Sequence, residues 1–200
     1  MVRDFSALSL SSIGDTRFLL NPESMQSPPD LYSPAMLVMT DFLQSVPVTI
    51  ASDTQVDRAL EFMKNQQVRL LFALDAGGAL SGIITAQDLT GSKVLSYIEQ
   101  GRLSREDVSV KHLMLPISEV QALTLDEVER ARIGDVIETL NQSGAAHLVV
   151  VDQGVAGVNR IRGIVSASNI SRLLHHNYEV ISEVGSFASR QWVLKSIQHR

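Results

Sequence analysis

The stretch that decides the fold is residues 82–88, Gly-Ile-Ile-Thr-Ala-Gln-Asp, which returns as Gly-Ile-Val-Ser-Ala-Ser-Asn at residues 163–169. In both places a glycine precedes two apolar residues, a hydroxyl residue and, three residues later, Asp or Asn. A hydroxyl residue and a carboxylate at this spacing are typical of a helix start, so each copy predicts a strand that runs into a helix. The recurrence indicates an internal duplication.

The duplication extends over most of the chain, because residues 39–95 align with residues 114–176. The apolar run at 71–75 matches the run at 148–152, and both end in Asp. The second copy has a longer loop after Asp152. Two copies of this length do not make a solenoid, which needs at least three short units.

Each copy is predicted to be strand–helix–strand–strand–helix. In the first copy, residues 47–50 read as a strand, and Ser52 with Gln55 predicts a capping box. Apolar residues at 56, 59, 60 and 63 then form one face of a helix. Buried strands are expected at 70–74 and 147–151, further strands at 80–85 and 161–166, and a helix end at Gly144. The predicted class is α/β (α+β), with the two copies packed together because one unit is too small to bury a stable core.

The regions outside the copies differ in composition. Residues 1–35 are rich in serine and proline and are interpreted as a loose arm, with a short ordered piece at 16–20. A helix is expected at 94–100. The predicted boundaries are an arm at 1–35, a first repeat at 36–100, a linker at 101–110, a second repeat at 111–176 and an apolar C-terminal tail or docking helix at 177–200.

The composition excludes several classes of protein. The chain has 200 residues, no cysteine and a formal net charge of −5, from 17 Lys+Arg and 22 Asp+Glu. The absence of cysteine excludes a disulfide framework and a thiolate metal site. The acidic balance argues against a nucleic-acid binder with a broad basic surface. With no apolar run long enough to span a membrane and no secretory signal at Met1, the expected location is the cytoplasm.

With two matched motifs, each after an amphipathic helix and an apolar run ending in Asp, residues 36–176 resemble the CBS domain family as a tandem pair, a stand-alone Bateman-type module. The resemblance implies tandem CBS repeats packed with pseudo-twofold symmetry and clefts between them. Phe72 and Val149 depart from the family, in which many of these strands carry proline at that position.

The resemblance also implies a nucleotide-binding role for matching positions. A hydroxyl at a helix start can bind a phosphate, which implicates Thr85 and Ser166. A carboxylate or amide one turn later can bind the ribose hydroxyls, which implicates Asp88 and Asn169. Asp88 is the better ribose ligand, because a charged acceptor makes stronger hydrogen bonds. The neighbouring apolar residues Ile84 and Val165 are assigned to the same sites.

Basic residues near the two strand starts are further candidates for the phosphate. Some family members carry such residues before the strand that ends in Asp, where this chain has Arg69 and His147. The alternatives are a surface arginine and a half-buried, hydrogen-bonded histidine. Arg160 and Arg162 are expected in the longer loop of the second copy, where they either reach the same anion or are simply solvated.

The predicted function is a regulatory module that reversibly binds an adenosine-containing ligand, such as AMP, ADP, ATP or S-adenosylmethionine, and signals to an unknown protein partner. No enzyme activity, covalent cofactor, metal site or membrane insertion is expected. A flat homodimer formed through the helices is expected from the resemblance. The alternative is a structural or interaction scaffold in which the motifs only cap helices and both clefts are vestigial.

Overall fold

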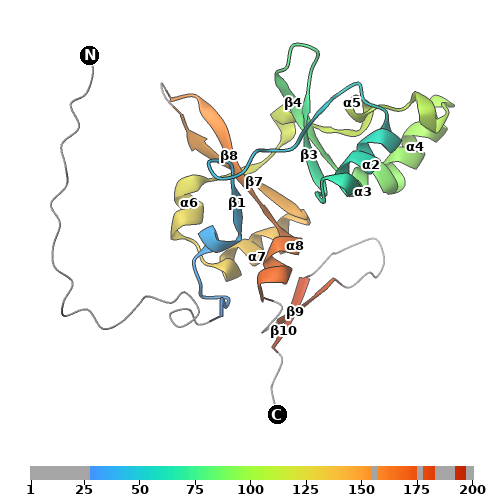
Figure 1. Ribbon diagram of the computed structural model, residues 1–200. Coiled ribbons are helices and arrows are strands. Elements are labelled where there is room, and N and C mark those ends of the chain that lie inside the picture. Colours follow the sequence, from blue (N-terminus) through green and yellow to red (C-terminus); the bar gives the residue numbers. More distant parts are fainter. Residues whose placement is uncertain (1–27, 155–156, 175–177, 183–191, 197–200) are drawn as a thin grey trace, which may run out of the picture.

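A computed structural model describes residues 28–154, 157–174, 178–182 and 192–196 (Figure 1). It shows a mixed α/β fold made of two lobes, one for each copy of the repeat. The first copy, with the crossover that follows it, contains β1 (Met39–Asp41), β2 (Thr49–Ala51), α2 (Val56–Asn65), β3 (Leu70–Leu74), β4 (Leu80–Thr85), α3 (Ala86–Thr90), α4 (Ser92–Gly101) and α5 (Val110–Leu113). The second contains β5 (Leu115–Pro116), β6 (Ala122–Thr124), α6 (Leu125–Arg130), α7 (Ile133–Ser143), β7 (His147–Gln153), β8 (Asn159–Ser166) and α8 (Ala167–Leu174). Short 3-10 helices lie at Ala35–Val38, Arg105–Asp107 and Ile117–Glu119.

Each lobe has its own hydrophobic core between a sheet and its helices. In the first lobe the α2 stripe, with Val56 and Ala59 fully buried, packs against Leu71 and Ile84 of the sheet. In the second lobe α7 and α8 pack in the same way against β7 and β8. The 3-10 helix at Ala35–Val38 joins this second core, although it precedes the first copy in the chain.

The two sheets exchange their first strands. One sheet has the order β2-β3-β4-β5 and the other β1-β8-β7-β6. In the first, Gly82 and Ile83 of β4 pair with Pro116 and Leu115 of β5, which belongs to the second copy. In the second, β8 pairs with β1, which belongs to the first copy. Each sheet is therefore complete only when both copies are present.

The two motif glycines make this exchange possible. A Cβ on Gly82 would lie 2.4 Å from the carbonyl oxygen of Leu115, and one on Gly163 would lie 2.5 Å from the carbonyl oxygen of Thr40. The backbones of neighbouring strands thus approach closely at both positions, which only glycine permits.

Most expected elements are present, and two local predictions are wrong. The structure confirms the strands at 70–74 and 80–85, the helix across 94–100, and the αL cap at Gly144, with a φ of 64°. The predicted box between Ser52 and Gln55 does not cap α2. Gln55 is itself the N-cap and accepts from the amide of Arg58 at 3.3 Å, because the helix begins one turn later than predicted. The expected strand at 47–50 begins only at Thr49.

The C-terminal region differs from the helix that was considered for it. The described residues form two antiparallel strands, β9 (Tyr178–Ser182) and β10 (Trp192–Ser196). Their Tyr, Trp, Val and Ile content favours strands over helices, which explains the difference. The ordered piece expected at 16–20 lies outside the described residues.

Candidate functional site

The first motif forms a complete helix cap at the start of α3. Thr85 is the N-cap residue, and its amide and Oγ1 both donate to Oδ2 of Asp88, at 2.9 and 2.6 Å. The Asp88 amide donates back to Thr85 Oγ1 at 3.3 Å. The other carboxylate oxygen of Asp88 accepts from Lys93 Nζ at 3.2 Å. Both carboxylate oxygens are therefore engaged within the protein.

The second motif is organised differently. Ser166 is buried, and its Oγ accepts from the amide of Asn169 at 3.1 Å. The side chain of Asn169 donates through Nδ2 to Thr40 Oγ1 at 3.1 Å and accepts through Oδ1 from Arg172 Nη2 at 2.6 Å. Thr40 lies on the exchanged strand β1, so this motif is tied to the first copy.

The apolar motif residues contribute packing rather than polar groups. Ile84 and Val165 are both 0 % exposed and belong to the two separate cores. Their side chains anchor the strands that end at Thr85 and Ser166.

Arg69 and His147 are brought next to the hydroxyl residues by strand pairing. The carbonyl of Arg69 accepts from the amide of Ala86, directly after Thr85, at 2.9 Å. His147 is the register partner of Ser166. The two basic residues, although on different copies, also lie close enough to interact. Burial, reinforced by the positive charge of Arg69, lowers the pKa of His147 to about 4. Its Nδ1 is buried without a hydrogen-bond partner among the described residues.

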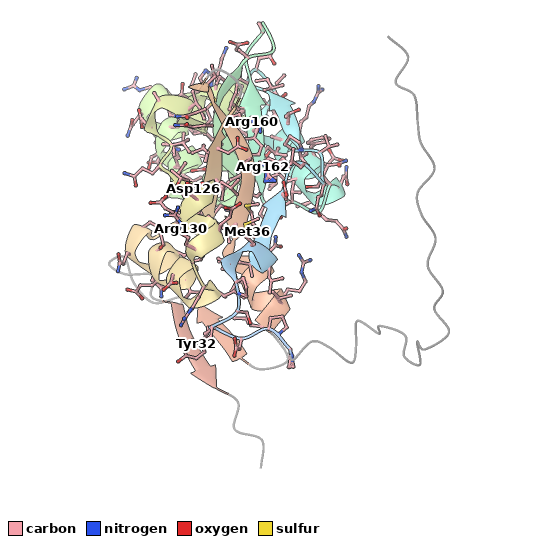
Figure 2. All side chains as sticks on the ribbon, turned by 90° about the vertical axis from the view of Figure 1, so that its left-hand side faces the viewer. Tyr32, Met36, Asp126, Arg130, Arg160 and Arg162 are labelled. Atoms are coloured by element: carbon pink, nitrogen blue, oxygen red, sulfur yellow. The ribbon has the colours of Figure 1, made fainter. Side chains whose placement is uncertain are left out.

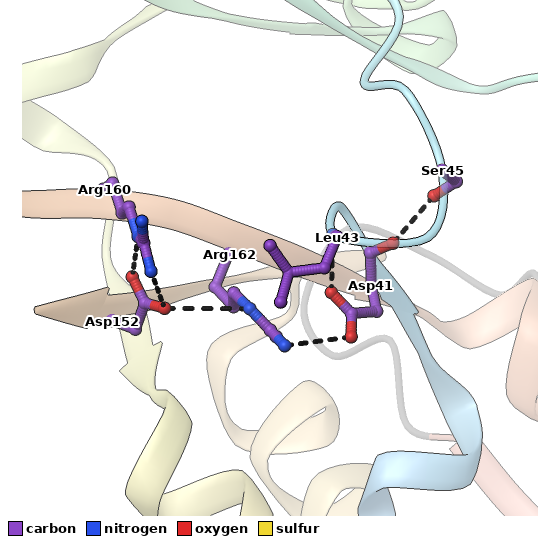
Figure 3. Close-up of polar contacts among 6 residues, drawn as sticks. All are labelled: Asp41, Leu43, Ser45, Asp152, Arg160 and Arg162. Atoms are coloured by element: carbon purple, nitrogen blue, oxygen red, sulfur yellow. Dashed lines mark hydrogen bonds and ion pairs between the residues drawn. The ribbon is translucent and has the colours of Figure 1, made fainter. Parts of the chain in front are cut away.

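Arg160 and Arg162 lie on strand β8, not in the loop expected for them. Arg160 makes a bidentate pair with Asp152, with Nε–Oδ1 at 2.6 Å and Nη2–Oδ2 at 3.1 Å (Figure 3). Arg162 contacts Asp152 at 3.7 Å and Asp41 at 3.0 Å. The pairing with Arg160 lowers the pKa of the Asp152 carboxyl. Because β8 extends to Asn159, both arginines belong to an ordered ion network rather than to the nucleotide motifs.

Three contacts of the motifs were not predicted. Lys93 lies five residues after Asp88 and on the next helix, α4, so helical spacing gave no signal for this contact. Arg172 lies three residues after Asn169 on the same helix, α8, where the spacing does give a signal. Thr40 is distant in sequence from Asn169, and only the fold brings them together.

Among the described residues, no group of three or more His, Asp or Glu side chains is arranged to hold a metal ion. Within the same residues, no helix combines the length and apolar character needed to cross a membrane.

Comparison with known protein families gives a match within the first copy. A family model described as the CBS domain matches residues 38–93. These residues are therefore similar to the CBS domain family. A search of curated protein sequences found no match. The likeness in fold extends beyond the matched CBS domain. An uncharacterised conserved protein from Pyrococcus horikoshii superposes with a TM-score of 0.50 and 19% identity, covering 72% of this chain and 92% of its own.

Two further structures are similar at lower TM-scores. CBSX2 of Arabidopsis thaliana, a CBS-pair protein crystallised with AMP, has a TM-score of 0.47 and 22% identity, covering 72% of this chain and 97% of its own. The CBS domain pair of protein MJ0100, in complex with 5-methylthioadenosine and S-adenosyl-L-methionine, has a TM-score of 0.48 and 21% identity, covering 74% of this chain and 98% of its own.

Proposed function

We propose that the chain is a cytoplasmic regulatory module that reversibly binds an adenosine-containing nucleotide between its two CBS-like repeats. No bond is made or broken. The ligand favours one arrangement of the repeats by the difference in its affinity for the two states, and a protein partner detects that arrangement. The active form is a homodimer.

The observation that carries this proposal is the placement of Arg69 and His147 beside the two motif hydroxyls. Each is placed by strand pairing beside a motif hydroxyl, Arg69 beside Thr85 and His147 beside Ser166. The positive charge of Arg69 also contributes to lowering the pKa of His147, so these two positions, from different repeats, lie within electrostatic range of each other. A phosphate is the group such a set suits, because Arg presents a fork of donors and a histidine with an unpaired nitrogen gains a partner.

The first motif is the stronger ribose site. Asp88 is released from Lys93 at little cost, since that pair is exposed, with side chains 46 and 24 % accessible, and such pairs contribute little stability. Asn169 is held from two sides, by Thr40 and Arg172. Oδ1, freed in this way, can accept from one ribose hydroxyl, and Oδ2 can accept from the other once its bonds with Thr85 are displaced.

The scaffold function is the second candidate, and one observation favours it. Thr85 and Asp88 form a complete capping box, which accounts for both residues without any ligand. Under this alternative the clefts remain empty, and binding to a protein partner is the whole function.

A thermal-shift panel separates the two functions. We expect at least one of AMP, ADP, ATP, methylthioadenosine and S-adenosylmethionine to raise the melting temperature. At a hundredfold excess over Kd the stabilisation is about 2.7 kcal/mol. Asp88→Ala is expected to weaken binding about tenfold or more, and Asn169→Ala to weaken it less.

The control is Glu127→Ala, which removes a carboxylate from a matching box. Glu127 accepts from the amide and Oγ1 of Thr124, both at 2.7 Å, at the start of α6. This variant should lose a cap yet keep the ligand response. A flat response of the wild-type protein to every ligand, or shifts unchanged in both motif variants, would support the scaffold instead.

A further inference from the structure

A cavity of about 370 Å³ lies between the two repeats, away from the motif residues. It is lined by Phe42, Leu43, Pro47, Thr49, Phe72, Leu74, Leu80, Arg160, Ile161 and Arg162. None of the motif residues, and neither Arg69 nor His147, belongs to this wall. The volume is at the lower end of the roughly 300–1,000 Å³ typical of small-molecule sites.

Most of the wall is apolar and comes from both copies. Phe42 and Phe72 meet edge to face, with ring centroids 5.6 Å apart and an interplanar angle of 82°. Leu80 and Ile161, at equivalent positions of the two copies, face the cavity from β4 and β8. A molecule bound here would touch both repeats at once.

The charged part of the wall consists of two arginines. The carboxylates that pair with them, on Asp41 and Asp152, are not part of the wall. Arg160 is accessible, with 56% of its side chain exposed, and its pair with Asp152 uses Nε and Nη2. Arg162 is only 13 % exposed and lies between the two aspartates, in contact with both (Figure 3). The polar groups that the wall presents to a ligand are therefore guanidinium donors, and Arg160 is held in a fixed orientation by Asp152.

A β-bulge explains how Arg162 reaches this position. The pairing of β7 with β8 shifts between Val150 and Val151, and Arg162 is the extra residue. Bulges redirect a side chain in this way. The first copy has a shift at the matching place, with Ser81 as its extra residue and Ala79 where the second copy has Arg160. The fold thus forms the same bulge with small residues, so the two arginines are a property of this cavity and not a requirement of the repeat. Figure 2 shows both on the β8 strand.

We propose that this cavity binds a small organic carboxylate with an apolar body, at a second site separate from the nucleotide clefts. The apolar body occupies the space between Phe42, Phe72 and Ile161. The carboxylate receives hydrogen bonds from Arg160 at the rim, where charge-assisted bonds are strongest. Because the wall comes from both repeats, this ligand stabilises one arrangement of the two lobes.

Calorimetry with three probes of the same chain length tests the proposal on the full-length protein. Octanoate, octanol and octylammonium share their apolar body and differ in the charge of the head group. We expect octanoate to bind about tenfold more tightly than octanol, and octylammonium to bind most weakly. Equal binding of all three, or no binding of octanoate to the folded protein, would overturn the proposal.

Two variants locate the site. Thr49→Tyr places a ring into the cavity from an exposed position of edge strand β2 and should abolish octanoate binding. Its control is Ala122→Tyr, because Ala122 holds the same place in β6, opposite Val149 as Thr49 is opposite Phe72. Arg160→Gln should remove the preference for octanoate over octanol.

Asp88→Ala distinguishes the cavity from the proposed nucleotide site, because this variant should leave the affinity for octanoate unchanged. Octanoate binding that survives both Thr49→Tyr and Arg160→Gln would contradict the assignment to this cavity. The outcome does not depend on whether a nucleotide binds.

Discussion

At Asp88 the carboxylate that we propose as the ribose ligand is also the acid of a helix capping box. Under this proposal, ligand binding replaces existing hydrogen bonds of the protein. The gain in free energy is the difference between the bonds formed with the ribose and those lost to Lys93 and Thr85. At Asn169 the competing partners are different, Thr40 and Arg172, so the two motifs are not equivalent.

His147 is expected to make stability depend on pH. Its pKa is lowered to about 4 in the folded protein, against 6.5 for the ordinary side chain, mainly by burial. Below pH 6.5 the unfolded chain takes up a proton that the folded chain does not. Stability attributable to His147 is therefore present above that pH and is lost as the pH falls toward 4. Between pH 7.5 and pH 5 the loss is about 2 kcal/mol.

Urea unfolding at the two pH values measures this loss. His147→Leu should reduce the pH dependence of the unfolding free energy by about 2 kcal/mol. The control is His112→Gln, because His112 stacks on Tyr97 at a centroid distance of 5.1 Å and is not at the same contact. An unchanged pH dependence in His147→Leu would show that the histidine titrates normally in the folded state.

At this scale the sequence predicted where the motif residues lie, but not what they contact. Thr85 and Ser166 were correctly placed at helix starts, because capping depends on near neighbours. The bond from Asn169 to Thr40 and the approach of Arg69 to His147 depend on how the copies pack. No local pattern encodes those contacts.

Among the elements, the exchanged strands β1 and β5 depend on two glycines. Gly82→Ala and Gly163→Ala each place a Cβ within 2.5 Å of a backbone carbonyl oxygen, which cannot move without shifting the neighbouring strand. Each substitution should lower the unfolding free energy by about 2 kcal/mol or more. Chemical denaturation of the two variants measures this directly.

The comparison variant is Gly77→Ala in the β3–β4 turn, where the nearest atom to the new Cβ is Oδ1 of Asp75 at 3.3 Å. This contact is longer and involves a side-chain atom instead of a strand backbone, so the unfolding free energy of Gly77→Ala should change by no more than about 0.5 kcal/mol. Equal stabilities for all three variants would mean that the strands separate easily.

Element types were predictable wherever periodicity or β-branched runs were strong, as in α2 and β3. The residues at which elements begin and end were harder to predict. The start of α2 was misplaced because Ser52 and Gln55 fit the spacing of a capping box, while the structure uses Gln55 alone. The C-terminal residues were apolar enough for a docking helix, yet their β-forming side chains pair as β9 and β10.

For the whole molecule, the exchange of strands predicts cooperative unfolding. Met63 lies in the first core and Leu140 in the second, each 1 % exposed. Met63→Ala and Leu140→Ala should each cost about 2–5 kcal/mol and shift one common transition. The reason is that neither sheet keeps all its strands when the other copy unfolds.

Urea unfolding monitored by circular dichroism, together with native-state hydrogen exchange, checks this. Amides of both lobes should lose protection together in either variant. Separate transitions, with one lobe protected while the other exchanges, would indicate that the repeats fold independently.

The overall class and the pairing of the copies were predictable, because the duplication itself is written in the sequence. The exchange of first strands and the cavity beside Arg160 were not. Both arise from contacts between residues far apart in the chain, and Arg160 and Arg162 were expected in a loop. The first copy has Ala79 and Ser81 where the second has Arg160 and Arg162. This difference between the copies can be interpreted only once the bulge in β8 is known.

The exchanged strands also bear on what happens if the chain is divided. A fragment that ends between the copies would keep an open sheet edge beside Gly82 and carry an unpaired β1. The other fragment carries β5, which pairs with β4, and β8, which pairs with β1. The two fragments are therefore suited to reassemble by fragment complementation. Two copies of the first fragment both lack β5, so the β4 edge of each stays open. Open sheet edges favour pairing between molecules. Joining both copies in one chain therefore keeps these edges paired and disfavours domain swapping between molecules.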